Sequence, residues 1–292
     1  MTGTGTPITH NTAQTQFVEA GGVSFAYRRF GYPDGPPLVM LQHFRGNLDN
    51  WDPALTDGLA AEHEVILVDY PGVGASTGEP GSTIAVMARQ IIGFTAALGF
   101  GEIDLLGFSI GGFVAQEIAL VRPTLVGRLV LAATGPKGAP GMHGWREDIA
   151  AAARAESSPK NLLYIMFAHT DTSQAKGKEY LGRFLKRQQA RDMPTSDVVR
   201  DAQYDAIVEW GIPDHTALQR LTGIRGPTLV IQGDNDLMIP TKLSHLLAGL
   251  VPDARIRIYP DAAHGFLFQY PSEVAAEVNA FLATDGAMMH SL

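Results

Sequence analysis

Residues 103–116 have the sequence IDLLGFSIGGFVAQ, and this stretch decides how the chain is organised. An apolar run with strand character ends at Gly107-Phe108-Ser109-Ile110-Gly111, and the apolar pattern then restarts with helical spacing. The glycines on both sides of the serine remove side chains that would clash in a tight strand-to-helix turn. The pattern therefore predicts a serine presented at the carboxyl end of a strand, beside the N-terminus of a helix.

Short apolar strands alternate with helices on both sides of this turn. Strands are expected at residues 16–20 and 23–30, which Gly21-Gly22 would join, and at 38–42, 64–69, 103–108, 127–133, 227–233 and 255–260. Helices are expected at 48–61, from Ser82 as N-cap to about 98, from 110 to just before Pro123, and at 242–250 and 272–283. Near-continuous apolar strands alternating with helices indicate an α/β fold, with a mostly parallel central sheet flanked by helices.

The alternation stops between two of the expected strands. Residues 135–218 contain helical patches and no convincing strand, so we expect an all-helical cap inserted into the α/β core. The predicted core comprises residues 15–134 and 219–285, with a flexible tail at 1–14 and a C-terminal tail at 286–292. Within the cap, the basic stretch RFLKRQQAR (183–191) is interpreted as the solvated face of a helix.

Composition excludes several classes of function. The chain has 292 residues and a formal net charge of −8, which does not favour nucleic acid as a partner. It has no cysteine, which excludes disulfides, thiolate catalysis and cysteine-ligated metals. The polar start does not resemble a signal peptide, and no apolar run reaches 18 residues, so we expect no membrane partner and a cytoplasmic location. The oligomeric state cannot be inferred from this sequence.

A serine hydroxyl is a weak nucleophile unless a base takes its proton and an acid orients that base. Two loops after late strands supply such residues. Asp234 and Asp236 follow the strand at 227–233, while Asp261 and His264 follow the strand at 255–260. Because the carboxyl ends of parallel strands meet at one edge of a sheet, the serine, an acid and the histidine are expected to meet there.

The motifs together resemble the α/β-hydrolase fold family over roughly residues 15–285. The matching segments are GFSIG (107–111), GDND (233–236) followed by Pro240, AAHGF (262–266), DYPGVGAST (69–77) and LQHFRGNLDNW (41–51). The resemblance implies Ser109 as nucleophile, His264 as base and Asp236 as acid. Asp234 and Asp261 are the competing carboxylates, and their residue type favours an interpretation as turn formers. It also implies an oxyanion hole formed by the backbone N–H groups of Ile110 and Phe44, and no cofactor or metal.

The segment 41–51 departs from the family pattern. When it is aligned on Trp51, the family's His-Gly pair becomes Gln42-His43 and the next glycine becomes Arg45; alternatively, His43 is the motif histidine shifted by one position. Arg45 either faces the pocket and pairs with a substrate carboxylate, or pairs with an acid such as Asp49 or points to solvent. The pocket candidates are His43, Arg45, Tyr164, Phe167 and Trp210.

These observations predict a serine hydrolase that cleaves a small, fairly apolar ester or lactone through an acyl-enzyme on Ser109. A second hypothesis keeps the three residues and changes the chemistry. It includes a cofactor-free perhydrolase (non-haem haloperoxidase), a C–C bond hydrolase, a lyase and a cofactor-independent oxygenase. A third is a non-catalytic, hydrolase-like receptor for a small ligand.

Overall fold

In the computed structural model, which describes residues 8–156 and 158–284, the chain folds around one eight-stranded sheet. Its strands are β1 Gln16–Ala20, β2 Val23–Gly31, β3 Leu38–Leu41, β4 Glu64–Val68, β5 Ile103–Phe108, β6 Val126–Ala132, β7 Thr228–Gly233 and β8 Ala254–Tyr259. Their order across the sheet is β1-β2-β4-β3-β5-β6-β7-β8. The β1–β2 and β2–β4 pairs are antiparallel and all the others are parallel, which confirms the predicted mostly parallel sheet.

The sheet is buried on both faces, as its apolar strands predict. Every residue of β3, β5 and β7 is buried. Val39 and Leu105 contribute to one apolar core, whereas Met40 and Leu106 contribute to a second core on the opposite face. Alternate residues of a strand point to opposite sides of the sheet, so a strand between two helix layers is apolar along most of its length.

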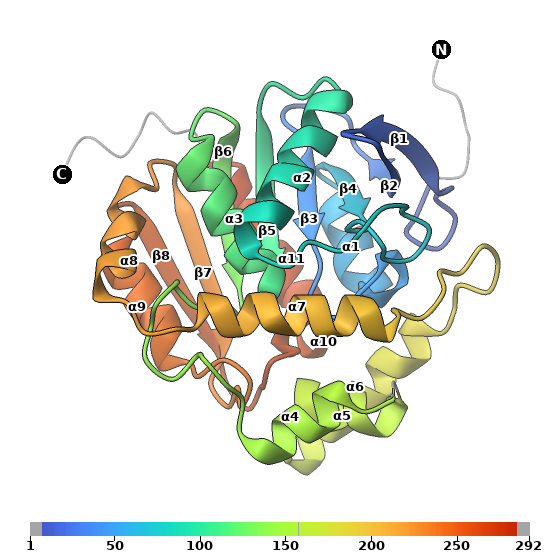
Figure 1. The fold of residues 1–292 in the computed structure, drawn as a ribbon. Helices are drawn as coiled ribbons and strands as arrows, with labels where there is room; N and C mark the ends of the chain where they lie inside the picture. Colours follow the sequence, from blue (N-terminus) through green and yellow to red (C-terminus); the bar gives the residue numbers. More distant parts are fainter. Residues whose placement is uncertain (1–7, 157, 285–292) are drawn as a thin grey trace.

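Six α-helices of the described residues cover these two faces. They are α1 Pro53–Ala60, α2 Ile84–Ala97, α3 Ile110–Val121, α9 Lys242–Leu250, α10 Phe266–Gln269 and α11 Pro271–Leu282. Helices α2, α3 and α9 pack on one core, and α1 and α11 pack on the other. Figure 1 shows α2 and α3 in front of the sheet, with α11 behind it.

The segment between β6 and β7, called the cap below, contains the helices α4 Glu147–Arg154, α5 Pro159–Met166, α6 Asp171–Phe184, α7 Asp197–Trp210 and α8 His215–Gln219. No strand lies in the part of this segment that the structure describes. The side chains of Ser158, Thr170 and Ser196 cap the N-termini of α5, α6 and α7. In Figure 1, α4, α5 and α6 gather at the lower side of the molecule, and α7 runs across between them and the sheet.

Two predicted helix starts need correction. Thr83, not Ser82, caps α2, because its Oγ1 accepts a hydrogen bond of 3.2 Å from Val86 N. The helix expected at 48–61 is two elements, a 3-10 turn at Leu48–Asn50 and α1. Asp52 caps α1 and Pro53 stands at its first position, and both features start a new helix there.

The described part of the predicted N-terminal tail is packed on the core, so that prediction is wrong for residues 8–14. His10 is buried, and its backbone N–H donates to Asp57 Oδ1 at 2.7 Å. Arg187 Nη1 donates to the carbonyl oxygens of His10 and Asn11 at 3.1 and 3.0 Å. Residues 1–7 and the C-terminal tail at 286–292 lie outside the described residues.

The basic stretch 183–191 is not a solvated helix face. Helix α6 ends at Phe184, and Arg187 in the following segment is buried. Arg183 donates to both carboxylate oxygens of Asp52. These arginines therefore connect the cap to the core and to the N-terminal segment.

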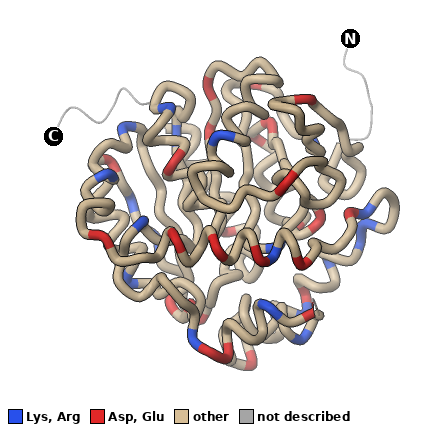
Figure 2. Tube along the Cα trace, in the orientation of Figure 1, with Lys and Arg blue, Asp and Glu red and all other residues tan. Residues whose placement is uncertain are grey.

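Acidic and basic residues are interspersed along the trace, and α7 carries an acidic row at Asp197, Asp201, Asp205 and Glu209 (Figure 2). Among the described residues, no helix combines the length and apolarity needed to cross a bilayer.

Candidate active site

Ser109 lies in the turn between β5 and α3 with φ 58° and ψ −120°, a strained conformation for a residue with a side chain. Neighbouring segments hold the turn in place. Ser109 N donates to the carbonyl oxygen of Ala132 at 2.9 Å, and Thr134 Oγ1 donates to the carbonyl oxygen of Ser109 at 2.9 Å. The surrounding structure thus fixes the conformation that presents the serine hydroxyl.

The glycines around Ser109 are required by close backbone approach. A Cβ atom on Gly107 would lie 2.4 Å from the carbonyl oxygen of Gly111. A Cβ atom on Gly111 would lie 2.2 Å from the carbonyl oxygen of Leu41, at the end of β3. The second distance also shows that the loop after β3 touches the first turn of α3, directly beside Ser109.

Three side chains from distant parts of the chain meet at this edge of the sheet. Ser109 Oγ lies 2.9 Å from His264 Nε2, and His264 Nδ1 lies 2.7 Å from Asp236 Oδ2. Asp236 follows β7 and His264 follows β8, and all three residues are buried. The structure therefore brings together the three residues that the sequence analysis selected.

The Asp236 carboxylate is held on both of its oxygens. Oδ1 accepts hydrogen bonds from the backbone N–H groups of Met238 at 2.8 Å and Ile239 at 3.0 Å. Oδ2 accepts from Gln232 Nε2 at 2.8 Å, as well as from His264 Nδ1. An ionised carboxylate only accepts hydrogen bonds, so His264 carries its hydrogen on Nδ1 and its Nε2 is free to accept one from Ser109.

The competing acids are engaged elsewhere. Asp234 Oδ1 accepts hydrogen bonds from Ala262 N at 3.1 Å and from Asn235 Nδ2 at 2.6 Å. Asp261 Oδ1 accepts from Thr170 Oγ1 at 2.8 Å. Both residues thus stabilise turns and the contact with the cap, as short acidic side chains often do.

The loop at 42–46 contains Phe44, the predicted oxyanion donor; it is called the oxyanion loop below on that prediction, and it is braced from within. Gln42 Oε1 accepts a hydrogen bond from His43 N at 2.8 Å, and Gln42 Nε2 donates to the carbonyl oxygen of Asn47 at 3.2 Å. A Cβ atom on Gly46 would lie 2.2 Å from Gln42 Cγ, so glycine is needed at this position. Gln42 thus folds the loop around its own side chain.

His43 is a neutral histidine with a defined tautomer. Its Nδ1 lies 2.8 Å from the carbonyl oxygen of Phe44, which can only accept, so the ring hydrogen is on Nδ1. Burial lowers the pKa of His43 to about 4. Its ring packs edge-on against Phe108, which in turn lies beside the His264 ring. His43 therefore adds an uncharged ring that packs against Phe108, on which the His264 ring also lies.

Of the predicted alternatives for Arg45, the pairing with Asp49 is wrong, whereas the side chain lines the cavity described below, and its pairing with a substrate carboxylate stays a prediction. Arg45 has φ 62°, in the left-handed region that favours glycine, and it occupies a position that is glycine in the family pattern. Its Nη1 donates to the carbonyl oxygens of Ala153 at 3.1 Å and Ala155 at 2.7 Å, at the end of α4. The predicted partner Asp49 forms a buried ion pair with Arg28 instead.

A cavity of about 250 Å³ lies between the oxyanion loop and the cap. From the loop it is lined by His43, Phe44 and Arg45, and its remaining lining comes mostly from apolar side chains of the cap. Those side chains include Ala152, Ala153, Leu162, Ile165, Met166, Leu181 and Phe184. Ser109 and His264 do not line the cavity, but Met166 links the two places, because its carbonyl oxygen accepts a 2.6 Å hydrogen bond from Gly265 N.

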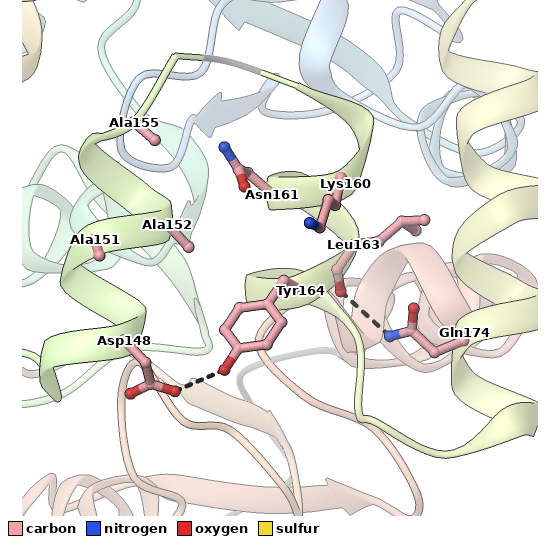
Figure 3. A pocket seen from close by; sticks show the side chains of 9 residues that line it. All are labelled: Asp148, Ala151, Ala152, Ala155, Lys160, Asn161, Leu163, Tyr164 and Gln174. Carbon is pink, nitrogen blue, oxygen red and sulfur yellow. Dashed lines mark hydrogen bonds between the residues drawn. The ribbon is translucent and has the colours of Figure 1, made fainter.

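The three aromatic pocket candidates of the cap lie elsewhere. Tyr164 lines a separate groove among α4, α5 and α6, where its hydroxyl donates to Asp148 Oδ2 at 2.7 Å (Figure 3). Phe167 is buried against Tyr180, and Trp210 stacks on Phe113 with ring centroids 5.3 Å apart. None of the three lines the cavity beside the oxyanion loop, and their place in the substrate pocket stays a prediction.

One residue that positions the site was missed from sequence. Gln232 holds Asp236, and the only signal was an amide in the mostly apolar strand β7. Met166 of the cap both lines the cavity and holds the residue after His264.

A buried serine–histidine–aspartate array at the carboxyl edge of a mostly parallel sheet defines the class of protein, because hydrolase sites on this architecture are built in this way. Consistent with this, the family model described as alpha/beta hydrolase fold matches residues 36–271. The chain belongs to the α/β hydrolase fold family. A solved α/β hydrolase fold protein from Chitinophaga pinensis shares 37% identity and a TM-score of 0.90, covering 95% of this chain and 100% of that one.

More distant relatives carry named activities. The pimeloyl-[acyl-carrier protein] methyl ester esterase of Serratia marcescens is 28% identical, covering 84% of this chain and 93% of the esterase. The biotin biosynthesis bifunctional protein BioHC of Teredinibacter turnerae is 25% identical over 86% of this chain, which spans only 45% of that protein. A solved N-acyl homoserine lactone degrading enzyme is 25% identical, with a TM-score of 0.69, covering 91% of this chain and 100% of that one.

Proposed function

We propose that this protein is a serine hydrolase that cleaves a small, fairly apolar carboxylic ester or lactone through an acyl-enzyme on Ser109. The observation that carries the proposal is the continuous chain of contacts from Ser109 Oγ through His264 to Asp236, at 2.9 and 2.7 Å. Relatives named as a methyl ester esterase and as a lactone degrading enzyme support this substrate class.

In the first half of the reaction, Ser109 Oγ attacks the substrate carbonyl carbon while its proton passes to His264 Nε2. The imidazolium is stabilised by Asp236, which accepts the Nδ1 hydrogen. The carbonyl oxygen becomes an oxyanion, for which the backbone N–H groups of Ile110 and Phe44 are the donors. The contact between Gly111 and the end of β3 supports this pairing, because it brings the two donor segments together.

Collapse of the tetrahedral intermediate breaks the bond to the alcohol oxygen, which takes the proton from His264 Nε2. A water molecule then gives a proton to His264 Nε2 and attacks the acyl carbon. The bond from this carbon to Ser109 Oγ breaks, and Oγ takes the proton back from His264 as the acid leaves. In a lactone the alcohol stays attached to the acyl group, so the same steps give a hydroxy acid.

The cavity supports a small and mostly apolar substrate. Its volume of about 250 Å³ is below the range of roughly 300–1,000 Å³ typical of pockets for larger ligands. The Arg45 guanidinium, which lines the cavity, already donates hydrogen bonds to two carbonyl oxygens. We therefore expect short acyl groups without a carboxylate to react best.

The test is hydrolysis of p-nitrophenyl esters of increasing chain length and of simple lactones by the wild type, Ser109→Ala and His264→Ala. We expect both variants to lose turnover, and a fluorophosphonate to label only chains that contain Ser109. Turnover that persists in Ser109→Ala but disappears in His264→Ala would instead indicate chemistry in which histidine acts as a base without acylation. Ligand binding without turnover of any substrate in the wild type would indicate a receptor.

A further inference from the structure

Arg45 stands directly after Phe44, whose backbone N–H is the expected oxyanion donor of the loop. Four hydrogen bonds join Arg45 to the cap, from its backbone as well as from its side chain. The residue is therefore a direct link between the expected oxyanion donor and the segment that covers it.

The guanidinium of Arg45 caps the C-terminus of α4. Helix α4 ends at Arg154, and the carbonyl oxygens of Ala153 and Ala155 accept hydrogen bonds from Arg45 Nη1 at 3.1 and 2.7 Å. The last carbonyls of a helix lack partners within the helix and carry partial negative charge, so a cation at this position is favourable. Arg200 of α7 donates to the intervening carbonyl oxygen of Arg154 at 3.3 Å but does not belong to the oxyanion loop.

The backbone of Arg45 is held by the cap as well. Its N–H donates to Gln203 Oε1 of α7 at 2.8 Å, and its carbonyl oxygen accepts from Thr195 Oγ1 at 2.7 Å. With φ 62°, the arginine is in a conformation that costs on the order of 1 kcal/mol or more and persists only where the surroundings impose it. In this protein those surroundings are the turn bond from Gly46 N to the carbonyl oxygen of His43, at 2.9 Å, and the two hydrogen bonds from cap residues.

The side chain of Phe44 is also held from the cap. Its ring is buried and lies edge-on to Trp145 with centroids 5.3 Å apart, and Trp145 lies 5.4 Å from the Tyr204 ring of α7. Both residues at this point of the oxyanion loop thus contact the cap, whereas the Gln42 side chain braces the two ends of the loop, at His43 N and at the carbonyl oxygen of Asn47.

We propose that Arg45 is a positioning residue that couples the cap to the oxyanion loop, so that the Phe44 N–H reaches its productive place only while α4 and α7 are seated on Arg45. This inference rests on the proposed serine hydrolase function. It assigns to the cap a part in transition-state stabilisation, in addition to shaping the substrate cavity. It also explains why a position that is glycine in the family pattern carries a long cation in this chain.

The test uses Arg45→Gly in the full-length chain. Glycine adopts φ 62° without strain and keeps the backbone groups that meet Gln203 and Thr195, so only the bonds to α4 are lost. Complete loss of one oxyanion donor costs about 10²–10³ in kcat, and we expect displacement of the donor to cost about tenfold. The matched control is Arg200→Ala, which removes a donor from the same end of α4 without touching the loop.

Two inhibitors separate positioning from general loosening of the structure. Butaneboronic acid forms a tetrahedral adduct on Ser109 that places an oxygen at the oxyanion position, whereas butyramide binds without forming an adduct. In Arg45→Gly we expect the inhibition constant of the boronic acid for p-nitrophenyl butyrate hydrolysis to rise about tenfold, in step with the loss in kcat. The inhibition constant of butyramide and KM should change less than threefold, and Arg200→Ala should match the wild type in all four values.

The coupling would be overturned if Arg45→Gly kept the wild-type kcat and the wild-type inhibition constant of the boronic acid. It would also be overturned if Arg200→Ala lost as much as Arg45→Gly, because the effect would then come from α4 alone. Failure of the proposed function is a separate result. In that case the boronic acid would not inhibit the wild type, and Ser109→Ala would still turn over the ester.

Discussion

Replacement of Asp236 by asparagine tests the site at Asp236 Oδ2, the oxygen that accepts hydrogen bonds from two side chains. The asparagine carbonyl oxygen can take the place of Oδ1 and keep the hydrogen bonds from Met238 N and Ile239 N. Its amide nitrogen then stands at Oδ2, where it faces two donors, Gln232 Nε2 and His264 Nδ1. Rotation of the Gln232 amide is opposed, because its Nε2 also donates to the carbonyl oxygen of Ile239 and its Oε1 accepts from Ser244 Oγ.

The histidine is therefore expected to change its tautomer. With its hydrogen on Nε2, His264 would accept a hydrogen bond at Nδ1 from the asparagine amide. It would then present an N–H group to Ser109 Oγ, so it could not take the serine proton. Loss of the correct tautomer lowers kcat by about 10⁴, which corresponds to about 5.4 kcal/mol of transition-state free energy. The fold should be little affected, since two backbone donors keep their partner.

The measurement is kcat for p-nitrophenyl acetate at pH 7.5, with Asp234→Asn as the matched control. Asp234 lies in the same loop and accepts from Ala262 N, which an asparagine carbonyl oxygen can also do. We expect the control to stay within about twofold of the wild type. An Asp236→Asn variant that keeps more than a tenth of wild-type kcat, or a control that loses activity as severely, would refute the reasoning.

Three further predictions concern stability. In Gly111→Ala the new Cβ would lie 2.2 Å from the carbonyl oxygen of Leu41, so we expect the unfolding free energy measured in urea to fall by more than about 3 kcal/mol. The control Gly101→Ala should lose almost none, because its Cβ would meet nothing within 4 Å. Equal losses in the two variants would contradict this prediction. Ser109→Gly relieves the strain of φ 58° and should raise the unfolding free energy by about 1 kcal/mol while ester turnover disappears; a less stable variant would count against strain at this turn. Burial raises the pKa of Asp104 from 3.8 to about 6, because the folded protein favours the protonated side chain. The stability of the folded state is therefore undiminished by this residue below pH 4, and it falls as the pH rises from 4 through 6. The unfolding free energy of Asp104→Asn, measured by denaturant titration relative to the wild type, should therefore rise by up to about 3 kcal/mol between pH 4 and pH 7.5. A difference that does not vary with pH would refute this.

The sheet and the residues around Ser109 could be predicted because local sequence determines them. Strands between two helix layers are mostly apolar, so β3, β5 and β7 are visible as nearly continuous apolar runs. The turn at Ser109 needs glycines on both sides because backbone atoms approach there. Residues that follow such strands are then placed at one edge of the sheet by topology alone.

The cap was less predictable because its side chains are fixed by partners far away in sequence. The sequence suggested a solvated helix at 183–191, whereas Asp52 and the N-terminal segment draw these arginines inward. Trp210 is held by Phe113 and by the carbonyl oxygen of Gly135, neither of which is visible from its own helix. Arg45 is another such case, since its partners are more than a hundred residues away.

The cap enters and leaves the core between β6 and β7, whereas Ser109, Asp236 and His264 follow β5, β7 and β8. A new cap could in principle be grafted at that junction to change which acyl groups are accepted, with the reacting groups left untouched. The hydrogen bonds between Arg45 and the cap limit which caps can be grafted. A new cap needs a residue at position 45 that its own helices can bind, so recombination and laboratory evolution of this scaffold should exchange that residue and the cap together.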